Sequence, residues 1–221
     1  MTKRAAPRIV GVICSRIDLE RALRMRTPPD FFELRLDMLV PSIRAPGKAV
    51  EKLPAPVIVT ARHPREAGAN QLSSRERRDL LLGFLSQAAY VDVELRSVRA
   101  LAAVLRAAKA NRVRTIVSFH DFRGTPSASR LDEIARAAES LGPEFIKIAT
   151  RTDTEAQLTR LLDFFERQTC GAKIVAMGIG KLGRSSRLHL ARRGCALNYA
   201  HLGKAQVPGQ LSMQELRAAL R

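Results

Sequence analysis

Short apolar runs recur along the chain at nearly even spacing, and amphipathic stretches lie between most of them. Eight runs are rich in Val, Ile or Phe, and they span residues 8–13, 31–36, 57–60, 90–94, 115–119, 145–149, 174–177 and, more weakly, 196–200. Continuous apolar runs of about four to eight residues are typical of parallel strands that are buried on both faces. The pattern therefore predicts eight buried strands.

The stretches between these runs carry the signals of helices. Leu80, Leu81, Phe84 and Leu85 are spaced so that they share one helical face. Three Ser/Thr-x-x-Glu motifs predict helix starts, at Ser73 with Glu76, Thr152 with Glu155, and Ser212 with Glu215. The segment 41–56 holds four prolines, and we expect it to be a loosely structured connection.

Strands that alternate with helices predict an α/β fold with a parallel sheet. Eight is the number of strands that closes into a (β/α)₈ barrel, also called a TIM barrel. No repeat, low-complexity tract or long linker divides the chain, and its length suits one domain. We therefore expect a single (β/α)₈ barrel domain over residues 1–221. An open, doubly wound sheet is the alternative, because a count of strands does not prove closure.

The formal charge of +17 narrows the class of ligand. Arginine supplies 30 of the 38 basic residues, and positive charge of this size raises the question of nucleic-acid binding. The arginines are spread along the chain rather than gathered in a tail, and aromatic residues that could stack on bases make up only 5%. We expect a basic surface that suits a small anionic substrate, and no specific nucleic-acid partner.

Cysteine and histidine positions argue against a disulfide framework and against a metal centre. Cys14, Cys170 and Cys195 are odd in number and lack C-x-x-C spacing, which favours the reducing cytoplasm. The histidines, at positions 63, 120, 189 and 201, show no metal-ligand spacing, so we expect no metal. No apolar run approaches the roughly 20 residues that span a bilayer, and charges soon after residues 8–13 favour a strand there over a signal peptide. We expect a cytoplasmic protein without a membrane partner.

Polar residues gather where the predicted strands end. In a (β/α)₈ barrel the catalytic groups come from the C-terminal ends of the strands and from the loops that follow them. The residues at these positions are Glu33, Arg35 and Asp37; Thr60, Arg62 and Glu66; Ser118, His120 and Asp121; Lys147; Ser186 and Arg187; and Gln210.

Lys147 and His120 carry the sharpest chemical signals. Lys147 lies inside the apolar run 145–149, where a charged amine is unfavourable and a neutral, nucleophilic amine is favoured. A lysine that pairs with a carboxylate, or that reaches out to solvent, would fit the same run. His120 has the side chain best suited to take and return a proton near neutral pH, although a histidine at a strand end is often a structural residue.

The segment 178–183 matches the dinucleotide-binding pattern G-x-G-x-x-G. That function also needs an acidic residue about 20 positions further on to bind the ribose. No acidic residue occurs between Glu166 and Glu215. We therefore do not interpret this segment as a dinucleotide site, and we expect no cofactor.

Taken together, these residues resemble type I 3-dehydroquinate dehydratase. Seven pieces occur in the family's order, namely Glu33-x-Arg35-x-Asp37, Thr60-x-Arg62 with Glu66, His120-Asp121-Phe122, Lys147-Ile148-Ala149, Met177-Gly178, Gly183-x-x-Ser186-Arg187 and Pro208-Gly209-Gln210. The resemblance implies a (β/α)₈ lyase, usually a homodimer, without metal or cofactor. Such an enzyme converts 3-dehydroquinate to 3-dehydroshikimate in the shikimate pathway, which leads to the aromatic amino acids.

The resemblance also implies a role for each matching residue. Lys147 would form a Schiff base with the substrate ketone, His120 would act as the acid and base for syn elimination of water, and Glu66 would position His120. The residues implied to bind substrate are Glu33, Arg35, Arg62, Arg187, Gln206 and Gln210. Gln206 stands where the family often has a serine.

Two other functions compete with this prediction. A lysine-dependent aldolase could grip a substrate phosphate with the glycines of 178–183, but Arg35, His120 and Gln210 would then share no function. A basic RNA-binding barrel or a degenerate paralogue would not be expected to keep so many polar strand ends intact.

Overall fold

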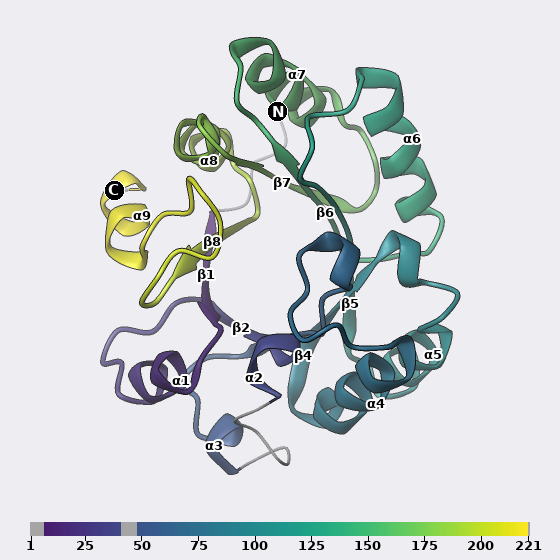
Figure 1. The fold of residues 1–221 in the computed structure, drawn as a ribbon, viewed down its shortest axis with the longest axis vertical. Helices are drawn as coiled ribbons and strands as arrows, with labels where there is room; N and C mark the ends of the chain where they lie inside the picture. The colour runs from purple at the N-terminus through teal and green to yellow at the C-terminus, as the bar shows by residue number, and fades with distance from the viewer. Residues whose placement is uncertain (1–6, 41–47, 221) are drawn as a thin grey trace.

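Eight parallel strands form the centre of the molecule, and the computed structural model describes residues 7–40 and 48–220. The strands are β1 (Arg8–Ile13), β2 (Phe31–Arg35), β3 (Val57–Thr60), β4 (Ala88–Glu94), β5 (Arg114–Asp121), β6 (Phe145–Arg151), β7 (Lys173–Ile179) and β8 (Leu197–His201). Consecutive strands from β1 to β7 are neighbours, and β8 returns to pair with β1. Figure 1 shows the strands as a ring with the helices outside it.

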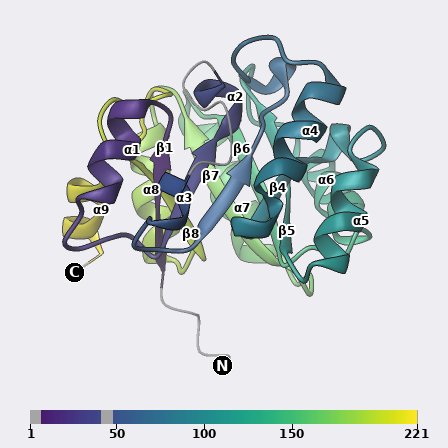
Figure 2. The ribbon, with the colours of Figure 1, turned by 90° about the horizontal axis from the view of Figure 1, so that it is seen from below.

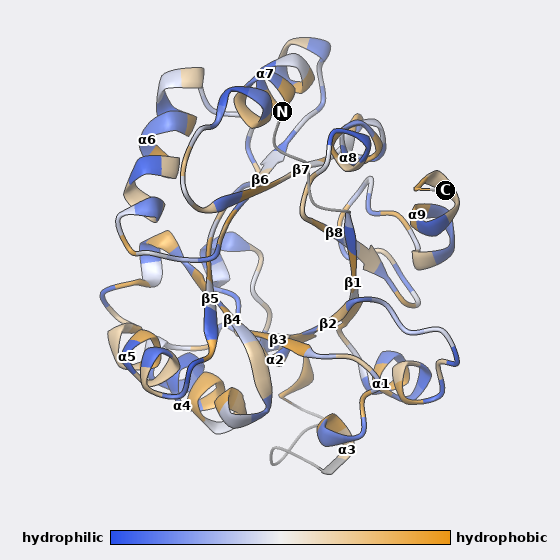
Figure 3. Ribbon diagram, turned by 180° about the vertical axis from the view of Figure 1, so that it is seen from behind, coloured by the Kyte–Doolittle hydropathy of each residue, from blue (hydrophilic) through white to orange (hydrophobic). Residues whose placement is uncertain are grey.

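The helices cover the outside of this ring. They are α1 (Arg16–Leu23), α2 (Leu36–Leu39), α3 (Lys48–Glu51), α4 (Ser74–Phe84), α5 (Ala102–Ala110), α6 (Ala128–Glu139), α7 (Glu155–Arg167), α8 (Gly183–Arg192) and α9 (Met213–Ala219), with short 3-10 turns η1 (Pro64–Glu66), η2 (Leu85–Gln87) and η3 (Leu95–Ser97). In Figure 3 apolar residues follow much of the strands, whereas the helices alternate between polar and apolar positions. This is the pattern of helices that bury one face against a sheet. No helix in the described ranges is long and apolar enough to cross a membrane.

The ring of strands is nearly closed. In the residues described, β7 and β8 form no backbone ladder with each other. The Arg187 side chain spans the gap, because its Nε donates to Gly178 O on β7 (3.1 Å) and its guanidinium NH1 donates to Tyr199 O on β8 (3.2 Å). The predicted (β/α)₈ barrel is therefore confirmed, and the open-sheet alternative is wrong because β8 pairs with β1. Its extent over all of 1–221 stays a prediction, since residues 1–6, 41–47 and 221 lie outside the described part of the chain.

The predicted strands are all present, and several continue beyond the apolar runs. β5, β6 and β7 each extend by two residues past the predicted C-terminal end. The apolar runs mark only the buried part of each strand. The hydrogen bonds between strands continue through polar residues such as His120, which pairs with Ala149. His120 and Asp121, which were expected at the end of the fifth strand, are thus held in the sheet.

Two of the three predicted helix starts are confirmed. Ser73 and Ser212 form capping boxes at the starts of α4 and α9. The prediction at Thr152 is wrong, because α7 begins two residues later, with Thr154 as its cap and Gln157 as the third helical residue. Thr152 is buried at the strand end, where its hydroxyl donates to Thr150 O (3.1 Å). A glutamine completes a capping box as well as a glutamate does.

The interior of the barrel is apolar towards the N-terminal ends of the strands and polar towards their C-terminal ends. Near the N-terminal ends of the strands, the Tyr90 ring packs on Phe31 and Phe145 with ring centroids 5.5 and 5.4 Å apart. Buried charged side chains lie further along the strands, among them Arg62, Asp92 and Lys147. Figure 2 shows the barrel from the side, with α2 beside the end at which the strands terminate. This polar end is where the candidate site lies.

Candidate active site

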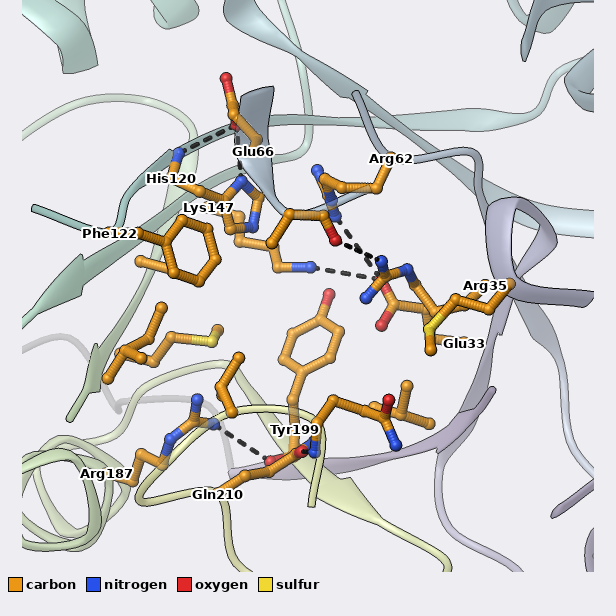
Figure 4. Close-up of a pocket in the computed structure, with 18 residues that line it drawn as sticks. Glu33, Arg35, Arg62, Glu66, His120, Phe122, Lys147, Arg187, Tyr199 and Gln210 are labelled. Carbon is orange, nitrogen blue, oxygen red and sulfur yellow. Dashed lines mark hydrogen bonds and ion pairs between the residues drawn. The ribbon is translucent and has the colours of Figure 1, made fainter. Parts of the chain in front are cut away.

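A pocket opens at the C-terminal end of the barrel, and all nine sequence-predicted site residues line it (Figure 4). They are Glu33, Arg35, Arg62, Glu66, His120, Lys147, Arg187, Gln206 and Gln210. The strands bring these residues together because parallel strands end at the same edge. Apolar side chains that include Met177 and Phe122 complete the wall.

Lys147 points from the middle of β6 into the barrel and is 3% exposed. Its Nζ lies 3.0 Å from Asp92 Oδ2 and 3.3 Å from Glu33 Oε1. Nζ also lies over the ring of Tyr199, 4.0 Å from the centroid. The carboxylates and the ring face stabilise a positive charge at this nitrogen, whether on an ammonium or on an iminium formed there. The carboxylate-paired lysine considered from the sequence is therefore what the structure contains, and it opens into the pocket.

Arg62 organises the carboxylates around Lys147. Its guanidinium pairs with both oxygens of Asp92 (3.1 and 3.0 Å) and donates to Ser118 Oγ (2.7 Å). It also contacts Glu94 (3.3 Å). Burial opposes ionisation of Asp92, but the charges of Arg62 and Lys147 outweigh it and hold the pKa of that carboxyl well below its usual range. Asp92 is thus a fixed negative charge beside the amine.

Asp92 and Glu94 were not predicted as site residues. The available signal was a pair of carboxylates two positions apart within the buried run 90–94, where residues two apart point to the same side of a strand. Glu94 also forms an ion pair with the fully buried Arg77 of α4. Arg77 also donates to Ala61 O (2.7 Å), so the charge network joins the barrel interior to the helix layer.

Glu66 and His120 form a second buried unit of the pocket. Glu66 Oε2 lies 2.8 Å from His120 Nδ1 and accepts the His120 backbone N–H (3.0 Å). Figure 4 shows Nδ1 on the Glu66 side and the opposite edge of the ring facing the pocket. Burial, then the charges of Arg62 and Lys147, lower the pKa of His120 well below its usual value. Burial raises the pKa of Glu66 to about 7. The imidazole is therefore neutral at neutral pH, as a base must be.

Asp37 holds the loop that carries Glu66. It is fully buried, accepts two hydrogen bonds from Arg35 (3.0 and 2.8 Å), and accepts the backbone N–H groups of Arg62 (3.1 Å) and Ala69 (3.0 Å). Burial opposes ionisation, but the bonds from Arg35 lower the pKa of Asp37. The Asp37 carboxylate thus fixes both the Arg35 guanidinium and the two ends of the segment 62–69, which contains η1.

Arg187 is buried without an acidic partner in the described part of the chain. Its polar contacts are the carbonyl oxygens of Gly178 and Tyr199, and burial lowers its pKa to about 10. A desolvated guanidinium that faces a pocket is a strong site for a carboxylate ligand.

The loop after β8 covers this side of the pocket. Gln210 Oε1 accepts the Gln206 backbone N–H (2.8 Å), and the Gln206 side chain turns back to Lys204 O (2.9 Å). Gly180 N–H donates to Pro208 O (3.0 Å). Gly209 has φ +85°, and a Cβ there would lie 2.7 Å from Gly183 Cα. The loop is therefore docked against the start of α8.

The glycines of 178–183 have a packing function. A Cβ at Gly178 would lie 2.2 Å from Ser186 Oγ, and one at Gly183 would lie 3.0 Å from Pro208 O. Close approach of α8 and of the last loop therefore requires these glycines. Across the described ranges, no group of three His, Cys, Asp or Glu side chains is arranged to hold a metal ion.

Comparisons with known proteins agree with one another. The model of the family "Type I 3-dehydroquinase" matches residues 15–221. A 3-dehydroquinate dehydratase of Thermococcus gammatolerans is 36% identical over 214 residues, which is 96% of this chain and 97% of that protein. One of Methanothermobacter thermautotrophicus is 33% identical, over 85% of this chain and 82% of that protein.

Solved structures show the same likeness. The crystal structure of 3-dehydroquinate dehydratase from Geobacillus kaustophilus is 25% identical with a TM-score of 0.86, over 98% of this chain and 90% of that one. The type I enzyme of Clostridium difficile, solved with covalently modified comenic acid, matches in fold with a TM-score of 0.86 at 24% identity, over 100% of this chain and 93% of that one. The match to the family model, the near full-length relatives and the barrel together show that this chain belongs to the type I 3-dehydroquinase family.

Proposed function

We propose that this chain is a 3-dehydroquinate dehydratase, a lyase that removes water from 3-dehydroquinate to give 3-dehydroshikimate in the shikimate pathway. One observation carries the proposal. The buried amine of Lys147 and the Glu66–His120 pair open into the same pocket, which also contains the guanidinium of Arg187, a group without an acidic partner among the described residues. These are a nucleophile, a neutral base and a carboxylate receptor.

The covalent step uses Lys147. Its amine adds to the C3 ketone of the substrate, and loss of that oxygen as water gives an iminium. The iminium draws electrons from the neighbouring C2–H bond and so acidifies it. Asp92 and Glu33 lie 3.0 and 3.3 Å from Nζ and stabilise the positive charge of the iminium.

The elimination step uses His120. Its pocket-facing nitrogen removes the C2 proton, the C–H electrons form the new double bond, and the C1 hydroxyl leaves after taking a proton from the same imidazole. Water departs, and hydrolysis of the iminium releases product and restores the amine. One acid–base group on one face of the ring gives syn elimination. Glu66 positions His120 through its bond to Nδ1 (2.8 Å).

The remaining predicted residues bind and orient the substrate. Arg187 and Gln210 receive the substrate carboxylate, with Gln206 in the covering loop. Glu33 and Arg35 bind ring hydroxyls. Arg62 lines the pocket, but its donors are engaged by Asp92, Glu94 and Ser118, so we assign it chiefly to holding the charges around Lys147.

The proposal extends to the state of the protein in the cell. We propose one catalytic domain over residues 1–221, a homodimer as the family resemblance implies, and a cytoplasmic location. The free state of Cys14, Cys170 and Cys195 supports a reducing compartment. Sedimentation over a range of protein concentrations tests the dimer.

Borohydride trapping tests the function. Turnover of 3-dehydroquinate should produce the ultraviolet absorbance of a conjugated enone, and borohydride added during turnover should attach substrate-derived mass to Lys147. Lys147→Met should abolish both signals. Lys173→Met, which changes a half-exposed lysine of β7, is the matched control and should abolish neither. Label on another residue, or turnover without label, would remove Lys147 from the mechanism. EDTA should leave turnover unchanged, since no proposed step uses a metal.

A further inference from the structure

Tyr199 places a buried hydroxyl in the pocket without a protein partner. The residue lies on β8 and is 5% exposed, and no described residue forms a hydrogen bond with its Oη. Figure 4 shows the hydroxyl pointing into the middle of the pocket, on the side of Lys147 and Glu33. A buried hydroxyl without a partner lowers the stability of a folded protein. Such a group in a pocket is expected to have a partner in the bound ligand.

The position of the ring identifies the part of the substrate that the hydroxyl can reach. Lys147 Nζ lies over the ring face, 4.0 Å from its centroid. The hydroxyl extends from the edge of the same ring to the Lys147 side of the pocket (Figure 4), which is where a carbonyl must lie for Nζ to attack it. The carbon that Nζ attacks, and the oxygen bonded to that carbon, would occupy this space.

We propose that the Tyr199 hydroxyl donates a hydrogen bond to the substrate oxygen on the carbon that Lys147 attacks. This inference rests on the function proposed above and adds a catalytic residue to it. As the amine adds to the carbonyl, the π electrons move onto that oxygen, and a donor placed there stabilises the developing negative charge. One proton of the amine passes to the oxygen. His120 takes a second proton from solvent at its pocket-facing nitrogen and delivers it to the same oxygen, which then leaves as water. Tyr199 keeps its own proton throughout.

The electrostatics of the pocket support a donor rather than a base. Burial, then the negative charges of Glu33 and Asp92, raise the pKa of Tyr199 well above its usual value. The hydroxyl therefore stays protonated over the whole working range of pH. The ring face and the hydroxyl have separate functions, since the face contacts the cation and only the hydroxyl reaches the oxygen.

Tyr199→Phe separates these functions, because it removes the hydroxyl and keeps the ring. We expect kcat/KM for 3-dehydroquinate to fall about tenfold, the size of one hydrogen bond. Borohydride trapping in a single turnover should show slower attachment to Lys147. The melting temperature should be unchanged or higher, because an unpartnered buried polar group is removed. A hydroxyl with a purely structural function would give the opposite, a lower melting temperature.

Tyr90→Phe is the matched control. Tyr90 is the other tyrosine of the chain, it is fully buried, and it lies at the opposite end of the barrel, where Arg114 stacks on its ring at 4.1 Å. Its kcat/KM and trapping rate should equal those of the unaltered protein. If the unaltered protein turns over 3-dehydroquinate and Tyr199→Phe is equally fast in turnover and in trapping, the inference is overturned and the function stands. If the unaltered protein shows neither turnover nor trapping, the function itself fails.

Discussion

At the scale of single residues, the pairing of Glu66 with His120 determines which nitrogen of the imidazole is a base. An ionised Glu66 accepts a hydrogen bond from Nδ1–H, which leaves the lone pair on the pocket-facing nitrogen. A protonated Glu66 donates to Nδ1 instead, and the pocket-facing nitrogen then carries the hydrogen. Because burial raises the pKa of Glu66 to about 7, this change of tautomer falls within the working range of pH.

We therefore expect kcat/KM to be lost as pH falls through about 7, although His120 itself stays neutral there because its pKa lies well below 6.5. Glu66→Gln cannot ionise, and its amide oxygen can accept a hydrogen bond from Nδ1–H at every pH. The variant should be slower than the unaltered protein at high pH and should lack the inflection. A pH profile of kcat/KM from about 5.5 to 9, around the ordinary histidine pKa, measures this. An identical inflection in both proteins would assign the titration to another group.

At the scale of elements, the loop between β8 and α9 is built around Gln210 rather than Gln206. Gln210 Oε1 fixes the backbone of the loop by accepting Gln206 N–H, whereas the Gln206 side chain donates to the neighbouring Lys204 O. The amide nitrogen of Gln210 is left as the end that can donate to a substrate carboxylate. Loop closure and substrate binding therefore depend on the same side chain.

Gln206→Ser should be tolerated, with KM changed by less than about tenfold, or roughly 1.4 kcal/mol. Gln210→Ala should raise KM more, because it removes both the acceptor for the loop and the donor for the substrate. Steady-state kinetics on the two variants compares them directly, with each serving as the control for the other. A silent Gln210→Ala beside an inactive Gln206→Ser would reverse the roles assigned to this loop.

At the scale of the whole molecule, a net charge of +17 surrounds a buried network of charges around Lys147 that is itself balanced. In this network Arg62, Lys147 and Arg77 of the helix layer pair with Glu33, Asp92 and Glu94. The excess of arginine therefore acts mainly through the surface, where it attracts an anionic substrate over a distance set by ionic strength.

We expect salt to slow substrate capture and to leave the chemical steps unchanged. Raising NaCl from about 0.02 to about 0.5 M shortens the Debye length from roughly 20 Å to about 4 Å. kcat/KM should fall several-fold over this range, whereas kcat should stay constant because the buried pairs are poorly screened. Kinetics in sucrose at matched viscosity controls for slower diffusion. A constant kcat/KM would mean that the surface charge has no part in substrate capture.

Much of the fold and of the site could be predicted from patterns of residues that are close together in the sequence. Eight apolar runs predicted the strands because burial on both faces requires apolar residues at every position of a short segment. The predicted site residues, such as Lys147 and His120, could be recognised because catalytic groups in a barrel follow strand ends, and strand ends can be found locally. The wrong helix start at Thr152 has another cause. Two possible caps lie two residues apart, and the backbone N–H of Thr152 is still bonded to Ile179 O of β7 (2.7 Å), so the helix begins after Thr154.

Only the tertiary structure decided which side chains contact one another in the site. Lys147 meets Asp92 and Glu33 across sequence separations of 55 and 114 residues, and the unpartnered hydroxyl of Tyr199 is recognised only once every neighbour is placed. Closure of the barrel likewise depends on β8 returning to β1, with Arg187 across the last gap. Apolar patterns and caps depend on adjacent residues, so the sequence by itself determined them. Charge pairing depends on strand register and on which strand ends face each other inside the barrel, and only the folded chain determines that.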